Sequence, residues 1–382
     1  MPTEETLRIE KLVYGGDGLA RHEGKVILIP YVLPGELVRV EMDRAKNDLW
    51  RGRLLEVIER SPARVPAPCE YFERCGGCHY QHAQDSDQLE FKRAILREVL
   101  RRVGKIEFDG EIAAISGEPW QYRNRVQLHV AAGRIGYFEH GSHTLCPITH
   151  CPISSPALNQ AIAKLSANVP NCTATVELFS NESETQVSVL DRVPRAAMTA
   201  FDSIGTGRPI DYKGFQVSRN SFFQVNRFLI DPLVDCALGS GSGASAVDLY
   251  AGVGLFAMRL AARYTKVTAV ESSRSAFRDL EHNTQGRVDT INSSTEDFLA
   301  TLNETPDLIL ADPPRAGLGK SVVRELVRIR APLLTIVSCD PATLARDLSG
   351  LLVAGYRIES VALVDLFPQT YHLETVVQVV AG

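Results

Sequence analysis

Eight cysteines carry much of this chain's capacity for chemistry, and three of them are closely spaced. Cys69, Cys75 and Cys78 form the pattern C-x5-C-x2-C, a thiolate spacing that suits zinc or an iron–sulfur cluster. Either site needs a fourth thiolate, and Cys146 and Cys151 are both candidates. The number of ligands does not separate zinc from iron. Disulfides are the less favoured alternative, because a reducing cytosol keeps thiols reduced.

A separate cysteine, Cys339, stands in "TIVSCDPATLARD", where an apolar run ends and a helix is expected to begin. A buried structural thiol is one interpretation, since cysteine behaves as a small hydrophobic residue. The other is a nucleophile, because α/β enzymes place their chemistry where a strand gives way to a loop.

A glycine-rich turn in "VDLYAGVGLFA" joins a predicted strand to a predicted helix. Gly252 and Gly254 allow close approach of the backbone to a ligand, and Glu271, nineteen residues after Gly252, can accept hydrogen bonds from ribose hydroxyls. The motif predicts a nucleoside-bearing cofactor. With Ala257 it also fits the dinucleotide pattern G-x-G-x-x-A, so a nicotinamide dehydrogenase is an alternative.

The stretch "DLILADPPRAG" favours a methyltransferase over a dehydrogenase. It ends a predicted strand with an acid, Asp312, and two prolines, a combination familiar from S-adenosylmethionine-dependent methyltransferases. Two apolar C-terminal segments, "YRIESVALVDLF" and "HLETVVQVV", predict a hairpin that adds antiparallel strands at the sheet edge, as many methyltransferases do.

The elements that must position these residues fall into three parts. Residues 1–60 contain short apolar runs split by glycine and proline, which predict an OB-like β-barrel. Residues 61–215 hold the cysteine cluster, an amphipathic helix over 86–103 that could pack on the last part, and glycine-punctuated strands. Residues 216–382 alternate apolar strands with helices, which predicts a Rossmann-like parallel sheet in an α/β protein.

Composition is that of an ordinary globular protein, with 382 residues, 45% hydrophobic and 23% charged. We expect a cytoplasmic protein with no membrane partner, because no apolar run is long enough to span a bilayer and the N-terminus lacks a signal-peptide pattern. The net charge of −5 means that binding of a polyanion depends on local basic faces. One candidate face is "WQYRNR", which interleaves aromatic and basic side chains: Trp120, Tyr122, Arg123 and Arg125.

These motifs together resemble the RNA 5-methyluridine (uracil-C5) methyltransferases. The similar stretches are "SFFQVN", "VDLYAGVGLF", "DPPRAGL" with "SCDPATLARDL", and "DLFPQTYHLETV". The N-terminal barrel resembles the TRAM domain of that family. The segment "CEYFERCGGCHYQH" is similar to the iron–sulfur segment of the members that act on 23S ribosomal RNA.

The resemblance implies a reaction in which Cys339 adds to carbon 6 of uracil, a methyl group passes from S-adenosylmethionine to carbon 5, and Glu374 removes the carbon-5 proton. It implies that Gln224, Tyr250, Glu271 and Asp312 bind the cofactor. It also implies a [4Fe–4S] cluster, with Cys151 as the fourth ligand after Cys69, Cys75 and Cys78.

Three positions depart from the family pattern. Asp340 places a carboxylate beside the thiol, which could raise the thiol pKa unless the side chain turns away. Ala251 and Leu255 replace a usual cysteine and asparagine in the glycine loop, so a polar contact to the cofactor is expected to be missing.

The expected partner is RNA, with 23S ribosomal RNA preferred and the thymidine loop of transfer RNA as the alternative. A non-catalytic RNA-binding protein that keeps the fold as a scaffold is the rival hypothesis. Cytosine methylation is disfavoured, because those enzymes usually carry a second cysteine near the D-P-P segment and "DPPRAG" has none. We expect a monomer.

Overall fold

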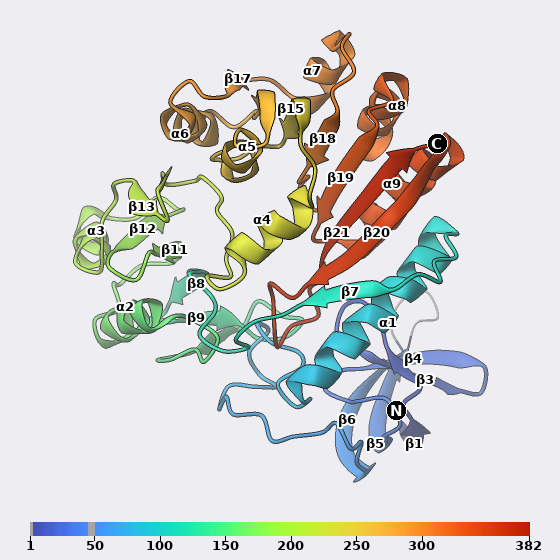
Figure 1. Cartoon of the computed structure of the whole chain (residues 1–382). Coiled ribbons are helices and arrows are strands. Elements are labelled where there is room, and N and C mark those ends of the chain that lie inside the picture. The colour runs from blue at the N-terminus through green and yellow to red at the C-terminus, as the bar shows by residue number, and fades with distance from the viewer. Residues whose placement is uncertain (1–2, 45–49) are drawn as a thin grey trace. The chain divides into compact units, whose positions relative to one another are not determined.

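The computed structural model describes residues 3–44 and 50–382, and its contacts divide the chain into two compact units (Figure 1). The first unit comprises Met1–Leu96, Tyr137–Ile148 and Phe367–His372, and the second comprises Arg97–Gly136, Thr149–Leu366 and Leu373–Gly382. Each unit is built from segments far apart in the sequence. The three-domain division at residues 60 and 215 stays a prediction. No described helix is long and apolar enough to cross a membrane.

The first unit is built on a sheet of short strands in the order β1-β5-β6-β4-β3-β2. Its strands alternate inward and outward side chains, and the inward ones form a core that includes Ile27, Val38 and Val40. This confirms the prediction of an N-terminal region made of strands. The strands are β1 (Thr3–Arg8), β2 (Lys11–Leu12), β3 (Gly18–His22), β4 (Lys25–Ile29), β5 (Leu37–Arg44) and β6 (Trp50–Glu59).

The long helix α1 (Asp85–Gly104) is close to the predicted range of 86–103 and continues from the first unit into the second. Lys92, on this helix, is fully buried, and its ammonium donates to the Phe367 carbonyl at 2.9 Å. The short strand β10 (Leu145–Pro147) lies in the second segment of the first unit.

The main sheet of the second unit has the order β17-β16-β15-β18-β19-β21-β20-β7. From β17 to β19 the strands are parallel, and they run 3-2-1-4-5 when numbered along the chain, which is a doubly wound arrangement. This confirms the Rossmann-like prediction. The strands are β17 (Asp289–Ile291), β16 (Tyr264–Val270), β15 (Gly243–Leu249), β18 (Leu308–Ala311) and β19 (Leu333–Ser338).

The predicted C-terminal hairpin is present, because β21 (Glu374–Ala381) pairs antiparallel with both β19 and β20 (Tyr356–Val364). The strand β7 (Ile112–Ile115) then adds to β20 in parallel. Figure 1 shows β19, β21 and β20 side by side. The helices of this sheet are α4 (Ile230–Leu238), α5 (Leu255–Leu260), α6 (Arg274–Thr284), α7 (Thr295–Thr301), α8 (Gly319–Ile329) and α9 (Pro341–Val353).

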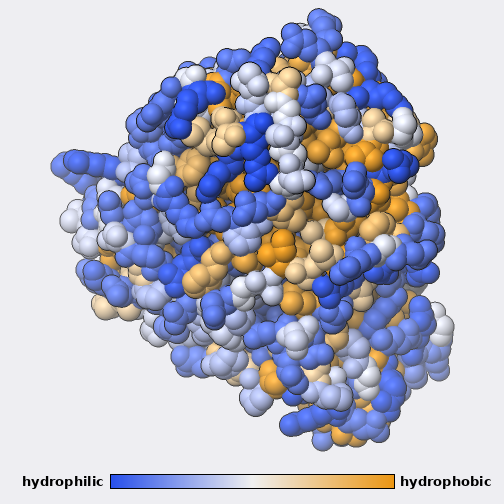
Figure 2. Space-filling model, in the orientation of Figure 1, coloured by the Kyte–Doolittle hydropathy of each residue, from blue (hydrophilic) through white to orange (hydrophobic). Residues whose placement is uncertain are grey.

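A smaller antiparallel sheet in the second unit contains β8 (Arg125–Ala131), which lies between β9 (Arg134–Phe138) and β11 (Ala174–Ser180), with β12 (Thr185–Val189) beyond β11. The helices α2 (Pro156–Ala167) and α3 (Arg195–Asp202) pack on it, and β13 (Ile210–Tyr212) forms a hairpin with β14 (Phe215–Val217). The visible molecular surface is mostly hydrophilic, with hydrophobic residues grouped near the middle of the view in Figure 2.

Candidate active site

Cys339 lies at the carboxyl end of β19, where the chain turns directly into α9. Strand β19 pairs antiparallel with β21, and the last pair in this register is Ser338 opposite Thr375. Cys339 is the residue after Ser338, and Glu374, the first residue of β21, is the residue before Thr375, so both adjoin this last pair. The candidate nucleophile and the candidate base that the family resemblance implies therefore lie at the ends of neighbouring strands.

The surroundings of Cys339 hold its thiol in the protonated form. The pKa of the Cys339 thiol is raised to about 11. Burial is the largest cause, the carboxylates of Glu374 and Asp312 add to it, and the guanidinium of Arg315 opposes it. A thiol with this pKa is a weak nucleophile until its environment changes.

Asp340 does not add to this effect, because its carboxylate turns to the amino end of α9. It accepts hydrogen bonds from the amides of Ala342 at 3.0 Å and Thr343 at 2.9 Å, and Pro341 occupies the first turn. This is an N-cap with a proline at the start of the helix. Asp340, which the sequence suggested could raise the thiol pKa, therefore caps the amino end of α9.

Glu374 and Asp312 form a pair of buried acids beside the thiol. Glu374 is only 4% exposed, and burial, followed by the charge of Asp312, raises its pKa well above its ordinary value. Burial likewise raises the pKa of Asp312. The amide of Gln224 donates to Asp312 at 3.4 Å, so the "SFFQVN" segment reaches the same acid. Two neighbouring buried carboxyl groups with raised pKa values are typical of acid–base catalysis.

The glycine loop after β15 has the open backbone that the sequence predicts. Gly252 and Gly254 adopt positive φ angles of 57° and 95°, and no atom lies within 4 Å of the position that a Cβ on Gly252 would occupy. Glu271 closes the loop from β16, accepting hydrogen bonds from the amides of Gly252 at 2.9 Å and Ser273 at 2.6 Å. This loop lies beside β18 at the point where the strand order reverses, which is where open α/β sheets bind ligands.

Tyr250 begins the loop with a φ of 61°, an unusual conformation for a residue with a side chain. It is half-buried, burial raises its pKa to about 12, and its hydroxyl bonds to Thr295. The two residues that depart from the family, Ala251 and Leu255, are both buried, at 5% and 7% exposure. Their apolar side chains pack into the protein.

Asp248 is an acid that the sequence analysis did not single out. It is fully buried in β15, and neither carboxylate oxygen has a partner at normal hydrogen-bond geometry, although the amide of Ala257 is close enough to lower its pKa slightly. Burial and then the charge of Asp312 raise its pKa well above normal. The available signal was a charged residue inside an otherwise apolar strand.

Asp279 on α6 is a second residue missed from the sequence. Its fully buried carboxylate accepts hydrogen bonds from Gln216 Nε2 at 3.0 Å, from the amide and hydroxyl of Ser218 at 2.8 and 2.7 Å, and from the Ser221 hydroxyl at 2.7 Å. One turn later, the side-chain amide of Asn283 donates to the backbone carbonyl of Val253 in the glycine loop at 2.9 Å. Helix α6 thus holds the segment before Gln224 next to the cofactor loop.

The "WQYRNR" prediction is wrong for two of its four side chains. Tyr122 is fully buried, and Arg125 is 8% exposed, stacked over the Phe179 ring at 4.4 Å and paired with Glu177 at 3.3 Å. They form part of the packing of the smaller sheet and cannot reach RNA. Trp120 and Arg123 are half-buried, and the Arg123 guanidinium bonds to the carbonyl of Arg125 at 2.9 Å.

The predicted metal ligands do not form a recognisable site. Cys69, Cys75 and Cys78 belong to the first unit and Cys151 to the second. None of the chain's cysteines is in a disulfide, and within the described ranges no three His, Cys, Asp or Glu side chains gather closely enough to hold a metal ion. The alternative ligand, Cys146, is buried and accepts a hydrogen bond from Arg74 Nε at 3.2 Å.

Comparison with known proteins identifies relatives along nearly the whole chain. A family model described as tRNA (Uracil-5-)-methyltransferase matches residues 148–381, and the TRAM domain model matches residues 3–55. An "Uncharacterized RNA methyltransferase" of Streptomyces avermitilis is 32% identical over 98% of each chain, and another of Aquifex aeolicus is 30% identical over 97% of each.

Among solved structures, the Pyrococcus abyssi tRNA (uracil-54, C5)-methyltransferase, determined in complex with S-adenosyl-L-homocysteine, superposes with a TM-score of 0.77. It is 26% identical, and the match covers 98% of this chain and 100% of that one. The family match spans most of the sheet, the glycine loop and both catalytic candidates. The chain therefore belongs to the tRNA (uracil-5-)-methyltransferase family and carries an N-terminal TRAM domain.

Proposed function

We propose that this protein transfers a methyl group from S-adenosylmethionine to carbon 5 of a uridine in RNA, with Cys339 as the nucleophile and Glu374 as the general base. The observation that supports the proposal is the β19–β21 pairing, whose last pair, Ser338 and Thr375, adjoins Cys339 and Glu374, with Asp312 electrostatically coupled to both.

Carbon 5 of uracil is a poor nucleophile, which is why a thiolate is needed. Addition of the Cys339 sulfur to carbon 6 forms a C–S bond and pushes the ring electrons onto carbon 5, which then takes the methyl group. Glu374 removes the carbon-5 proton, the ring double bond reforms, and the Cys339–carbon 6 bond breaks. Arg315, which lowers the pKa of Cys339, favours the thiolate at the first step and at the last.

The residues at the sheet's switch point fit a nucleoside-bearing methyl donor. When bound, S-adenosylmethionine supplies an electrophilic methyl group on a positively charged sulfur. In this proposal Glu271, which accepts a hydrogen bond from Gly252, also accepts from ribose hydroxyls, and the open space at Gly252 admits the ligand close to the backbone. Gln224, Tyr250, Gly254 and Asp312 complete the proposed set, and the unpartnered acid Asp248 supplies further acceptors.

Trapping with RNA that contains 5-fluorouridine tests the mechanism. Fluorine cannot leave as a cation, so the adduct with Cys339 should persist and be resolved by denaturing electrophoresis. Cys339→Ala should form none, and Cys172→Ala, a change in a cysteine outside the site, should form it normally. Glu374→Gln should still form the adduct but should release little product from ordinary uridine. Adduct formation in Cys339→Ala would refute the assignment, and no adduct in the wild type would favour a non-catalytic RNA-binding protein.

The RNA that we propose first is 23S ribosomal RNA, and its support is the cysteine pattern of residues 69–82. Transfer RNA is the second candidate, favoured by the match to the Pyrococcus abyssi enzyme. Methylation of purified 23S ribosomal RNA and transfer RNA with labelled S-adenosylmethionine distinguishes them. We also propose that the protein acts as a monomer, in which residues 1–60 and 61–215 bind RNA and residues 216–382 carry the methyltransferase activity.

A [4Fe–4S] cluster bound by Cys69, Cys75, Cys78 and Cys151 is a further part of this proposal. It rests on the C-x5-C-x2-C spacing, and no step of the reaction depends on it. Anaerobically purified protein should contain iron and acid-labile sulfide that are lost in Cys75→Ser and kept in Cys172→Ser. Stoichiometric zinc without sulfide would contradict the cluster.

A further inference from the structure

Two aromatic side chains, Phe222 and Phe228, are exposed to solvent. In residues 3–44 and 50–382, Phe222 and Phe228 are the only phenylalanine, tyrosine or tryptophan residues classed as exposed, at 57% and 37%. Both lie in the segment "SFFQVNRF" and flank Gln224. Exposing an aromatic ring costs solvation free energy, so two such rings on one short segment point to a binding surface.

The backbone that presents Phe228 is held firmly by buried asparagines. Asn124 donates from its side chain to the Gln224 carbonyl at 3.0 Å, and its amide donates to the Val225 carbonyl at 2.9 Å. Asn226 is fully buried, and its side chain accepts a hydrogen bond from the amide of Phe228 at 3.0 Å. The ring therefore projects from a fixed loop.

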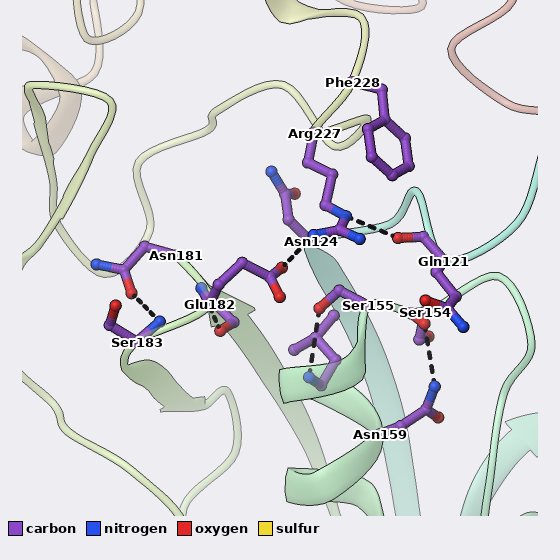
Figure 3. A network of polar contacts seen from close by, with 12 residues as sticks. Gln121, Asn124, Ser154, Ser155, Asn159, Asn181, Glu182, Ser183, Arg227 and Phe228 are labelled. Atoms are coloured by element: carbon purple, nitrogen blue, oxygen red, sulfur yellow. Dashed lines mark hydrogen bonds and ion pairs between the residues drawn. The ribbon is translucent and has the colours of Figure 1, made fainter. Parts of the chain in front are cut away.

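Arg227 covers one side of the ring. Its guanidinium lies 4.5 Å from the centre of the Phe228 ring, and it is itself fixed by a 2.9 Å hydrogen bond to the Gln121 carbonyl and a 3.4 Å ion pair with Glu182 (Figure 3). The two partners leave the arginine little freedom to move away. A planar cation held against an aromatic ring forms a two-layer stack whose outer layer, Phe228, still has 37% of its surface exposed.

This stack lies near the proposed reaction centre. Gln224 contacts Asp312, and the Asn226 side chain donates to the Leu366 carbonyl at 3.1 Å, two residues after Val364, which pairs with Glu374. Four residues of chain span at most about 14 Å, so the backbone of Phe228 is within that distance of Gln224. An RNA strand whose uridine enters the site must pass close to this ring.

We propose that Phe228, supported by Arg227, stacks on an unpaired nucleobase that neighbours the target uridine in the RNA. The inference rests on the proposed function, because it assumes that RNA enters this site. A uridine extruded from its own stack leaves its neighbours partly unstacked, and a fixed aromatic ring replaces the lost contact for any base sequence. In this proposal the aromatic and basic residues that contact RNA are Phe228 and Arg227, and not those of "WQYRNR".

The test compares Phe228 variants on two RNA probes by fluorescence anisotropy at low salt. One probe is a single-stranded RNA of about 12 nucleotides, within the site sizes of single-strand binders, with one central uridine. The other replaces the bases on both sides of the uridine by abasic sites. Phe228→Ala should bind the first probe about 5- to 150-fold more weakly, since one base–aromatic stack has that value. Phe228→Trp should bind at least as well as wild type, and Phe228→Leu should be as weak as alanine.

The abasic probe identifies the partner of the ring. Wild type should bind the abasic probe more weakly than the first probe. Phe228→Ala should bind both probes with the same affinity, because the variant lacks the ring that stacks on the missing bases. Val353→Ala, which truncates an 88% exposed side chain on α9, is the matched control and should bind both probes normally. Unchanged thermal midpoints and S-adenosylhomocysteine affinity show that the Phe228 variants remain folded.

Four results would overturn the inference: wild-type affinity in Phe228→Ala, equal affinity in the leucine and tryptophan variants, equal losses on the abasic probe in wild type and Phe228→Ala, or no binding of the first probe by wild type. The failure of this inference is separable from that of the proposed function. If fluorouridine RNA still forms the Cys339 adduct while Phe228→Ala binds normally, only the stacking role is wrong.

Discussion

The raised pKa of Cys339 predicts that the ligand-free protein reacts slowly with alkylating reagents. At about pH 8, a thiol with a pKa of about 11 is roughly 0.1% ionised, whereas the ordinary value of 9.0 gives roughly 10%. Because only the thiolate reacts, iodoacetamide should label Cys339 about 100-fold more slowly than a small-molecule thiol with the ordinary pKa. The rate constant is measured by quantitative mass spectrometry of the peptide that contains Cys339.

The pH dependence gives the decisive result. Below its pKa the thiolate fraction rises tenfold for each pH unit, so the labelling rate should climb with that slope from about pH 7 to 9.5 without levelling off. Arg315→Ala removes the guanidinium that lowers the thiol pKa and should slow labelling. Glu374→Gln should speed labelling only at pH values where Glu374 is ionised, because the pKa of that acid is itself raised well above normal. Burial is the largest cause of the Cys339 shift, so neither variant should abolish it. A plateau below about pH 9 in the wild type would show that the thiol is already activated and would refute the reasoning.

Three other changes test the elements that position the site. Asp279→Ala leaves four donated hydrogen bonds without their acceptor, so we expect the free energy of unfolding, measured by denaturant titration, to fall by about 2–4 kcal/mol. S-adenosylhomocysteine binding, measured by calorimetry, should also weaken. Unchanged cofactor affinity would contradict the link between Asp279 and the segment before Gln224. Gly254→Ala places a Cβ 2.8 Å from Leu280 at a φ of 95°, so a thermal midpoint equal to wild type would be inconsistent with the strain that we expect. Asp340→Ala should cost about 1 kcal/mol through loss of the α9 cap, and Asp340→Asn should restore most of it.

Much of the second unit could be predicted because its signals are local. Apolar strands of branched residues, a glycine turn and an acid nineteen residues later follow from short stretches of sequence, and the hairpin placed Glu374 at a strand end next to that of Cys339. The roles of Cys339 and Glu374, in contrast, came from the family resemblance and not from these local signals.

The errors and omissions concern contacts between distant residues. "WQYRNR" has the same pattern whether its side chains face solvent or a core. Arg125 is buried because of partners far away in the sequence: Glu177, Phe179 and Ser221. The same holds for Asp279, whose acceptor role depends on a segment about sixty residues earlier. Such partners have no local signature, so the sequence predicts the element and misses the contact.

The electrostatics of the site also order the proposed reaction. Glu374 raises the pKa of Cys339, so the thiolate forms more readily while Glu374 keeps its proton, which the raised pKa of that acid favours. Once sulfur is bonded to carbon 6 it is a neutral thioether and no longer competes for negative charge. The remaining obstacle to ionisation of Glu374 is then its burial and the charge of Asp312. Loss of the nearby negative charge makes Glu374 easier to ionise, so more of it is available as a carboxylate after addition, which is the stage at which the carbon-5 proton must leave.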